Sequence, residues 1–153
     1  MAIGEIFSVL AQVPALLKLK RGMKPRKLDE RDCFARQVEN HAENYAEGVA
    51  AIFEGRTVTW GELNAGANRY AARLLEMGVT RGDVVSVFME NRIEFLESVI
   101  ALNKIGATGG LINTNLRGRP LTHCISVTES KKCIFGAELS EAIQEVKGEL
   151  NLV

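Results

Sequence analysis

The sequence contains few cysteines, and their arrangement argues against two classes of protein. Cys33, Cys124 and Cys133 form no C-x-x-C pair, and three cysteines cannot all pair within one chain. The pattern disfavours a secreted disulfide scaffold and favours a reducing compartment, so we expect a cytoplasmic protein. His41 and His123 are too far apart in sequence to form a zinc-ligand pair with local cysteines, and we predict no metal site.

A long apolar run is also missing. The longest candidate, from Ile6 to Leu17, is shorter than the roughly 20 apolar residues that a membrane-spanning helix needs. It is further interrupted by Gln12 and Pro14. A secretory signal would carry positive charge before its apolar run, whereas Glu5 precedes this one. The segment therefore cannot cross a bilayer unaided.

The chain has no net charge, because 19 basic residues balance 19 acidic ones. This balance gives no support for a nucleic-acid partner, and we predict none. The basic residues are nevertheless concentrated near the start, at Lys18, Lys20, Arg21, Lys24, Arg26 and Lys27. They follow a helical stripe of apolar residues made of Ile3, Ile6, Leu10, Val13 and Leu17.

This combination predicts that residues 1–27 form an amphipathic, basic segment that lies on an anionic membrane surface. Each basic residue near such a surface contributes up to about 1 kcal/mol. The protein would then sit peripherally on the cytoplasmic face of a membrane. The alternative is a helix packed on the rest of the protein, followed by a solvated basic linker, and the pattern fits both equally well.

Familiar catalytic motifs are absent as well. The sequence contains no G-x-S-x-G, H-E-x-x-H or Walker lysine, and no paired carboxylates at general-acid spacing. Gly106, Gly109 and Gly110 leave a predicted helix and enter a predicted strand, which is the reverse of a phosphate loop. His123 and Cys124 are neighbours, and adjacent residues on a helix diverge by about 100°. We therefore predict no catalytic residue.

The central stretch reads as helix, strand, helix, strand. Thr59 and Glu62 have the spacing of a capping box, which predicts a helix from Trp60 that ends before Gly78. The run 84–89 is short, β-branched and apolar, as expected for a strand covered on both faces. Asn91 is a good N-cap for a second helix, which Gly106 would end.

A second buried strand is predicted from Gly110 to Ile112, and each strand-helix-strand passage is long enough for a parallel crossover. The flanking sequence predicts a helix over 29–47, a hairpin of 49–53 and 56–58, a helix over 120–127, a strand over 132–135 and a helix over 137–146. The fold class is therefore α/β, with a partial doubly wound, mostly parallel sheet and flanking helices. Because residues 150–153 read as the start of another strand, we expect residues 28–153 to be an incomplete α/β portion.

One polar cluster follows the second predicted strand, at Asn113, Thr114, Asn115 and Arg117. Ligands of open α/β sheets bind at the carboxyl ends of strands, so these residues are a candidate ligand loop. The alternative is an ordinary surface loop.

From about Tyr45 to its end, the chain resembles the N-terminal part of the adenylate-forming acyl-CoA synthetases. The shared motifs, in order, are T-W-G-E-L-N, A-N-R-Y-A-A-R-L, G-V-T-R-G-D-V-V, M-E-N and N-K-I-G-A. The segment L-I-N-T-N-L-R-G-R-P-L-T-H-C, from Leu111 to Cys124, is most similar to the branch of fatty acid transport proteins and very-long-chain acyl-CoA synthetases. The apolar-then-basic start is similar to the membrane-associating beginnings of that branch.

The resemblance implies a two-step reaction in the full-length parent. ATP and a fatty acid, with Mg²⁺ on the phosphates, would give an acyl-adenylate, which coenzyme A would convert to a thioester. The family's phosphate loop, adenine-binding motif, ribose-binding aspartate and C-terminal lysine normally lie beyond the part that this sequence resembles. We therefore expect a fragment of a long-chain or very-long-chain fatty acyl-CoA synthetase that binds none of these cofactors and is inactive alone. The alternative is a stand-alone membrane-surface or partner-binding α/β module without catalysis.

Overall fold

The structure is a computed structural model that describes residues 13–17 and 32–152. It divides into two units, Met1–Arg31 and Asp32–Val153. In the first unit, residues 13–17 are helical and their side chains are exposed. The six basic residues of the predicted membrane-surface segment lie outside the described residues. Within the described residues, no helix is both long enough and apolar enough to cross a membrane.

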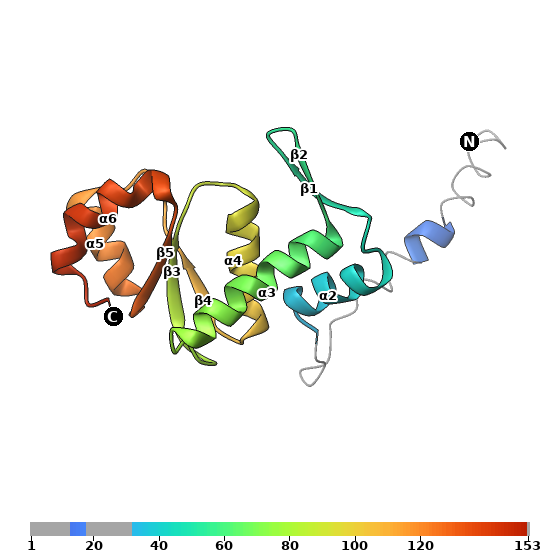
Figure 1. The fold of residues 1–153 in the computed structure, drawn as a ribbon, viewed down its shortest axis with the longest axis horizontal. Coiled ribbons are helices and arrows are strands. Elements are labelled where there is room, and N and C mark those ends of the chain that lie inside the picture. The colour runs from blue at the N-terminus through green and yellow to red at the C-terminus, as the bar shows by residue number, and fades with distance from the viewer. Residues whose placement is uncertain (1–12, 18–31, 153) are drawn as a thin grey trace, which may run out of the picture. The chain divides into compact units, whose positions relative to one another are not determined.

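The second unit alternates helices and strands (Figure 1). Its elements are α2 (Phe34–Asn44), β1 (Val49–Phe53), β2 (Arg56–Thr59), α3 (Trp60–Glu76), β3 (Val84–Phe88), α4 (Ile93–Lys104), β4 (Thr108–Leu111), α5 (Gly118–Val127), β5 (Lys132–Phe135), the 3-10 turn η1 (Ala137–Leu139), α6 (Ser140–Val146) and the 3-10 turn η2 (Lys147–Glu149).

Two sheets are present among the described residues. β1 and β2 form an antiparallel hairpin, whose turn residues Glu54 and Gly55 both have positive φ, at 48° and 78°. Positive φ at both positions is typical of the type I′ turn that suits the twist of a two-residue hairpin. The other sheet has the strand order β4-β3-β5, and both of its pairings are parallel. The predicted parallel sheet is therefore confirmed.

The two faces of the central strand β3 are covered by different helices. Val85 and Val87 belong to a core cluster with residues of α3 and α4. Phe88 belongs to a second cluster with residues of α5 and α6. Figure 1 shows the same division, with α3 and α4 on one side of the sheet and α5 and α6 on the other. Since side chains alternate along a strand, this arrangement explains why nearly every residue of β3 is buried and apolar.

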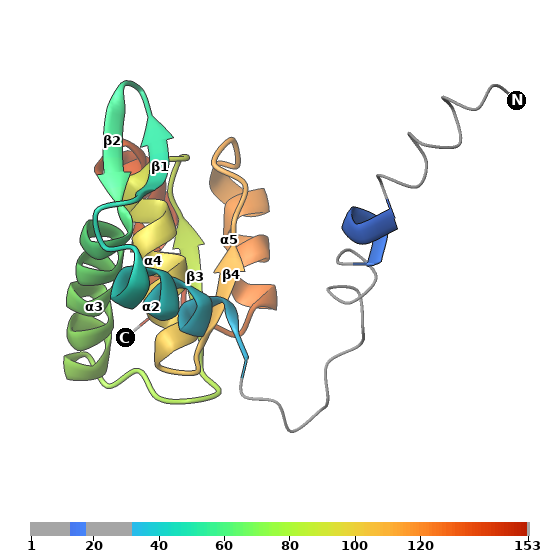
Figure 2. The same cartoon turned by 90° about the vertical axis from the view of Figure 1, so that its right-hand side faces the viewer.

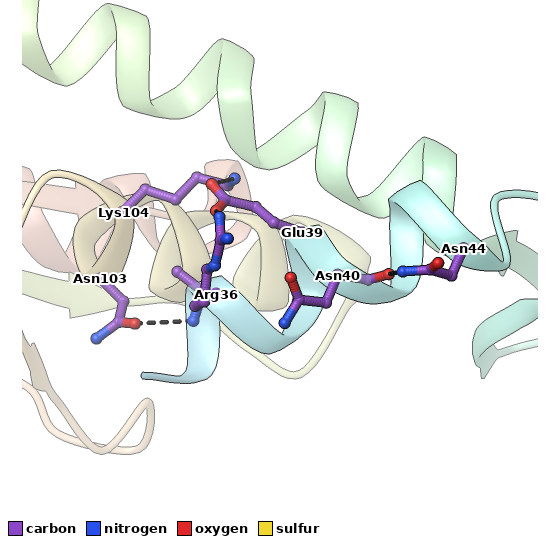
Figure 3. Close-up of polar contacts among 7 residues, drawn as sticks. Arg36, Glu39, Asn40, Asn44, Asn103 and Lys104 are labelled. Carbon is purple, nitrogen blue, oxygen red and sulfur yellow. Dashed lines mark hydrogen bonds and ion pairs between the residues drawn. The ribbon is translucent and has the colours of Figure 1, made fainter. Parts of the chain in front are cut away.

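Helix α2 lies next to α3 and α4, below the β1–β2 hairpin (Figure 2). Its buried residues Ala35 and Val38 share a third core cluster with residues of β2, α3 and α4. Polar contacts from the end of α4 add to this packing (Figure 3). The Asn103 side-chain oxygen accepts a hydrogen bond of 2.9 Å from the backbone N–H of Ala35, and Lys104 Nζ lies 2.6 Å from Glu39 Oε1.

The local end signals were predicted with mixed success. The capping box of α3 is complete, since the Thr59 and Glu62 side chains each bond the other's backbone N–H. The predicted N-cap of α4 was wrong, because the extended residue at that position is Arg92, one residue after Asn91, and it makes no side-chain cap bond. β4 begins at Thr108, earlier than the predicted Gly110, because the Thr108 N–H already donates to the carbonyl oxygen of Asp83, directly before β3.

Candidate functional site

A cavity of about 670 Å³ lies at the carboxyl ends of β3 and β4. Residues that follow the two strands form most of its lining, and the hairpin and α4 complete it: Phe53, Met89, Glu90, Asn91, Phe95, Leu111, Ile112, Asn113 and Thr114. We call it the switch-point cavity. Five of these residues are apolar, and the four polar ones come from the loops that follow β3 and β4.

The strand order explains why a cavity forms here. From β3 the chain passes through α4, on one face of the sheet, to β4; from β4 it passes through α5, on the opposite face, to β5. The helical connections that follow the adjacent parallel strands β3 and β4 therefore run over opposite faces of the sheet. Such a topological switch point opens a crevice outside the carboxyl ends of the strands, where open α/β sheets bind their ligands.

Glu138 of η1 contacts the loop after β3 and holds it in place. One carboxylate oxygen of Glu138 accepts a hydrogen bond of 3.3 Å from the backbone N–H of Glu90, and the other lies 3.0 Å from Arg92 Nη2. Gly136 allows this arrangement, because a Cβ at residue 136 would lie 2.0 Å from Glu138 Oε1. The positions of Glu90 and Asn91 at the cavity therefore depend on a residue that is distant in sequence.

The loop after β4 is held by its own polar groups. The Asn113 side-chain oxygen accepts a hydrogen bond of 2.9 Å from the Asn115 N–H, a local turn that asparagine favours. Arg117 Nη1 donates to the carbonyl oxygens of Thr114 and Leu116, both at 2.7 Å. Of the four residues of the predicted ligand loop, Asn113 and Thr114 line the cavity, whereas Asn115 and Arg117 lie in the supporting loop.

Several residues that line the cavity were not predicted as site residues from the sequence. Glu90 and Asn91 follow a predicted strand in the same way as Asn113 does, so the carboxyl-end rule applied to β3 would have found them. Asn91 was instead interpreted only as a helix cap. Phe53 comes from the hairpin, and no local signal shows that the hairpin reaches the end of the parallel sheet.

A smaller cavity of about 340 Å³ adjoins the first and shares Phe53, Glu90 and Asn91 with it. Its wall carries an ion pair between Arg56 and Glu94, with Nη1 and Oε1 3.1 Å apart. A hydrogen bond from its own backbone N–H, and secondarily the Arg56 guanidinium, hold the pKa of Glu94 below its ordinary value. Glu94 is therefore ionised at neutral pH and pairs with Arg56.

The side chains that line the switch-point cavity do not fit a nucleoside triphosphate or its magnesium ion. The lining residues include the carboxylate of Glu90 and no lysine or arginine, so the phosphates would meet no positive side chain. Among the described residues, no group of three or more histidine, cysteine, aspartate or glutamate side chains is placed to hold a metal ion. The apolar lining instead suits the non-polar part of a ligand.

Comparison with known proteins gives a family match over most of the chain. A family model described as "AMP-binding enzyme" matches residues 38–152. Long-chain fatty acid transport protein 1 of Bos taurus is 33% identical over 146 residues, which are 95% of this chain and 22% of that protein. The medium/long-chain-fatty-acid–CoA ligase FadD6 of Mycobacterium tuberculosis is 30% identical over 138 residues, 90% of this chain and 23% of the ligase. The chain thus spans less than a quarter of the length of these relatives.

Solved structures share the same fold. The N-terminal domain of FACL13 from Mycobacterium tuberculosis is 28% identical, with a TM-score of 0.70, covering 74% of this chain and 29% of that one. The anthranilate CoA ligase AuaEII, in complex with anthranoyl-AMP, has a TM-score of 0.73 at 23% identity, covering 77% of this chain and 23% of the ligase. The similarity to AuaEII supports the fold alone, because the sequence identity is only 23%.

Proposed function

Because the chain belongs to the AMP-binding enzyme family, we propose that it forms part of the N-terminal domain of a fatty acyl-CoA synthetase. The parent enzyme would activate a long-chain or very-long-chain fatty acid with ATP and Mg²⁺ and transfer the acyl group to coenzyme A, in fatty acid uptake and lipid metabolism. The observation that carries the proposal is the family match, which extends over the sheet and its cavity. The names of the relatives, a fatty acid transport protein and a fatty acid–CoA ligase, support the choice of substrate.

The described residues would contribute to this activity by shaping one wall of a crevice. Phe53, Phe95 and Leu111 offer apolar surface, while Asn113 and Thr114 present polar groups at the strand end. Asn115 and Arg117 would keep the loop in its conformation. The groups that bind nucleotide, magnesium and coenzyme A would come from other parts of the enzyme, so we expect the chain alone to be inactive.

A chimera tests the proposal. Residues 38–152 would replace the corresponding segment of the FadD6 ligase, and thioester formation would be measured with ATP, coenzyme A and oleate. We expect activity to be retained, and the isolated chain to form no thioester. Asn113→Ala in the chimera should raise KM for the fatty acid, whereas Ser126→Ala on the exposed face of α5 should leave it unchanged. A folded but inactive chimera would contradict the ligase assignment, and thioester formation by the isolated chain would contradict its expected inactivity.

A second candidate role belongs to residues 1–27. Six basic residues directly follow an apolar stripe, and this order supports binding of an anionic membrane surface on the cytoplasmic side. The role is compatible with the ligase proposal, and it also fits a stand-alone membrane-surface module. Residues 28–153 would then be the α/β portion that the segment anchors.

Vesicle flotation of the full chain tests this role. The chain should float with phosphatidylserine-containing vesicles, and float less when the salt concentration is raised, because exposed charges are screened. Replacing the six basic residues with glutamine should abolish flotation, while Lys147→Gln, an exposed lysine of the α/β unit, should have no effect. Equal flotation with neutral phosphatidylcholine vesicles would contradict an electrostatic surface role.

A further inference from the structure

The loop after β3 lines both cavities at this end of the sheet. Glu90 and Asn91 belong to the lining of both cavities, and Arg92 belongs to that of the smaller one. The residues on either side of these three, Met89 and Ile93, are buried and anchor the two ends of the loop. Between the anchors, Glu90 and Asn91 are exposed, so contacts from elsewhere in the fold decide how they face a ligand.

Glu138 provides two such contacts, one on each side of Asn91. Its Oε1 accepts a hydrogen bond of 3.3 Å from the Glu90 N–H, and its Oε2 lies 3.0 Å from Arg92 Nη2. Arg92 occupies the N-cap position of α4 but forms no side-chain cap bond there, and its ion pair is with Glu138 instead. One carboxylate thus holds the backbone before Asn91 and the side chain after it.

Glu138 lies in a turn that is anchored in the core. The next residue, Leu139, is 3% exposed and belongs to the core cluster of α5 and α6. The Leu139 N–H donates to the Gly136 carbonyl oxygen at 2.9 Å, and the Gly136 N–H donates to the carbonyl oxygen of Phe88 in β3 at 3.0 Å. Gly136 also leaves space for the carboxylate, since a Cβ there would lie 2.4 Å from Glu138 Cδ. Contacts outside the loop after β3 therefore determine where the carboxylate lies.

We propose that Glu138 is a positioning residue for the switch-point cavity, which keeps Asn91 in the conformation that the fatty acid binds. The inference rests on the proposed function, because that function supplies the fatty acid as the ligand. Glu138 itself lines neither cavity, so its effect on the ligand passes through the loop after β3. Its loss should weaken binding of the fatty acid in the ground state and the transition state alike, which raises KM and leaves kcat nearly unchanged.

Kinetics of the chimera that carries residues 38–152 in the FadD6 ligase test this role. Glu138→Ala removes both contacts and should raise KM for oleate by about fivefold. Glu138→Gln has only one carbonyl oxygen and can keep one of the two contacts, so its KM should be intermediate. Glu141→Ala is the matched control and should leave KM unchanged, because Glu141 is an exposed glutamate of α6 that lines neither cavity. KM for ATP and for coenzyme A should stay the same in all variants.

Gly136→Ala displaces the carboxylate without changing Glu138. The three nearest atoms that the new Cβ would meet all belong to the Glu138 carboxyl group, so the methyl group acts on that group first. Gly136→Ala should raise KM for oleate as Glu138→Ala does. In a Glu138→Ala background it should have no further effect, because both changes remove the same contacts.

NMR relaxation of the full chain examines the loop without any assumption about the ligand. The backbone order parameters of residues 90–92 should fall in Glu138→Ala and stay unchanged in Glu141→Ala. Unchanged order in Glu138→Ala would show that the carboxylate does not fix the loop, and would overturn the proposal.

The kinetic results distinguish a failure of this role from a failure of the ligase assignment. A chimera with the wild-type segment that forms no thioester contradicts the ligase proposal, and with it the role of Glu138. An active chimera in which Glu138→Ala and Gly136→Ala leave KM for oleate unchanged overturns the role of Glu138 alone. An increase confined to KM for ATP or coenzyme A does the same. Circular dichroism checks folding, and Glu138→Gln and Gly136→Ala decide the question if Glu138→Ala does not fold.

Discussion

Gly66 of α3 and the Glu97 side chain of α4 occupy complementary space. A Cβ at residue 66 would lie 2.2 Å from Cδ and 2.9 Å from Cγ of Glu97, closer than atoms can approach. Glycine inside a helix normally costs about 1 kcal/mol relative to alanine. Here it allows α3 to accept a large polar side chain from the neighbouring helix, so the two residues should be energetically coupled.

The first prediction is that Gly66→Ala destabilises the protein. The new methyl group must displace the buried Glu97 side chain, and overpacking of this kind costs about 1–3 kcal/mol, which exceeds the gain in helix propensity. Urea denaturation of the full chain measures the change in the free energy of unfolding. Gly148→Ala is the control, because a Cβ there meets no atom within 4 Å.

A double variant separates this clash from other effects of the alanine. In a Glu97→Ala background the space is empty, so Gly66→Ala should be neutral or stabilising, as in an ordinary helix. If Gly66→Ala costs the same with and without Glu97, the contact between these residues is not the cause of the destabilisation.

The second prediction concerns the pH dependence of stability. Burial raises the pKa of Glu97 above its ordinary value of 4.5, the nearby Glu94 adds to the effect, and Arg69 and Arg56 oppose it. The folded state therefore holds this proton more tightly than the unfolded state. The resulting stabilisation is fully present below pH 4.5 and is lost as the pH rises through the folded-state pKa.

Comparison with Glu97→Gln, which does not titrate at this position, isolates the effect. The free energy of unfolding of the wild type, minus that of the variant, should decrease between about pH 4 and pH 8. Glu39 has a lowered pKa and gives the opposite trend, but it is common to both proteins and cancels in the difference. A difference that increases over this range would contradict the prediction.

The elements that the sequence predicted well are those with local signals. The Thr59–Glu62 capping box needs only a spacing of three residues, and the central strand β3 stands out as a short β-branched run. The position of Glu97, in contrast, cannot be predicted from local signals. It lies one helical turn after the buried Ile93, so its position faces inward, while a glutamate is expected to face solvent. Only the packing against Gly66, which is distant in sequence, resolves the conflict.

The residues that line the switch-point cavity also divide into those that local signals predict and those that depend on tertiary packing. Asn113 and Thr114 could be found because they follow a predicted strand directly. The contribution of Phe53 could not, because it depends on the placement of the hairpin against α4 and the end of β4. Likewise, Glu138 supports the loop after β3 through two contacts that no local pattern indicates.

The third prediction concerns the start of α2, which has no cap from its own sequence. Cys33 occupies the N-cap position without a side-chain hydrogen bond, and the Asn103 oxygen instead accepts from the Ala35 N–H at 2.9 Å. Asn103→Ala removes that acceptor and should lower the free energy of unfolding by about 1 kcal/mol. Asn103→Asp keeps an acceptor and should retain most of the stability.

Hydrogen exchange locates this effect. The Ala35 amide should exchange faster in Asn103→Ala than in the wild type, while amides of β3, in the core of the sheet, should change only as much as global stability does. Unchanged protection of Ala35 would show that the Asn103 contact does not hold the helix end.

The fourth prediction concerns the ion pair that joins the same two helices. Lys104 Nζ lies 2.6 Å from Glu39 Oε1, and the lysine side chain is only 8% exposed. The hydrogen bond from Lys104 is the largest cause that lowers the pKa of Glu39 below 4.5, while Arg36 contributes less, at 3.6 Å. Lys104→Met should therefore raise the pKa of Glu39 clearly, and Arg36→Gln should raise it by a smaller amount.

The pKa of Glu39 can be followed by NMR titration of its side-chain carboxyl carbon. The direction in which Glu39 changes stability with pH follows from its lowered pKa. In the wild type, Glu39 contributes stability above pH 4.5, and this contribution is lost as the pH falls through the folded-state pKa. In Lys104→Met that acid-induced loss should become smaller, because the folded and unfolded pKa values move together. If Arg36→Gln shifts the Glu39 titration more than Lys104→Met does, the exposed arginine rather than the buried lysine is the main partner, and the α2–α4 contact does not depend on Lys104 as the structure indicates.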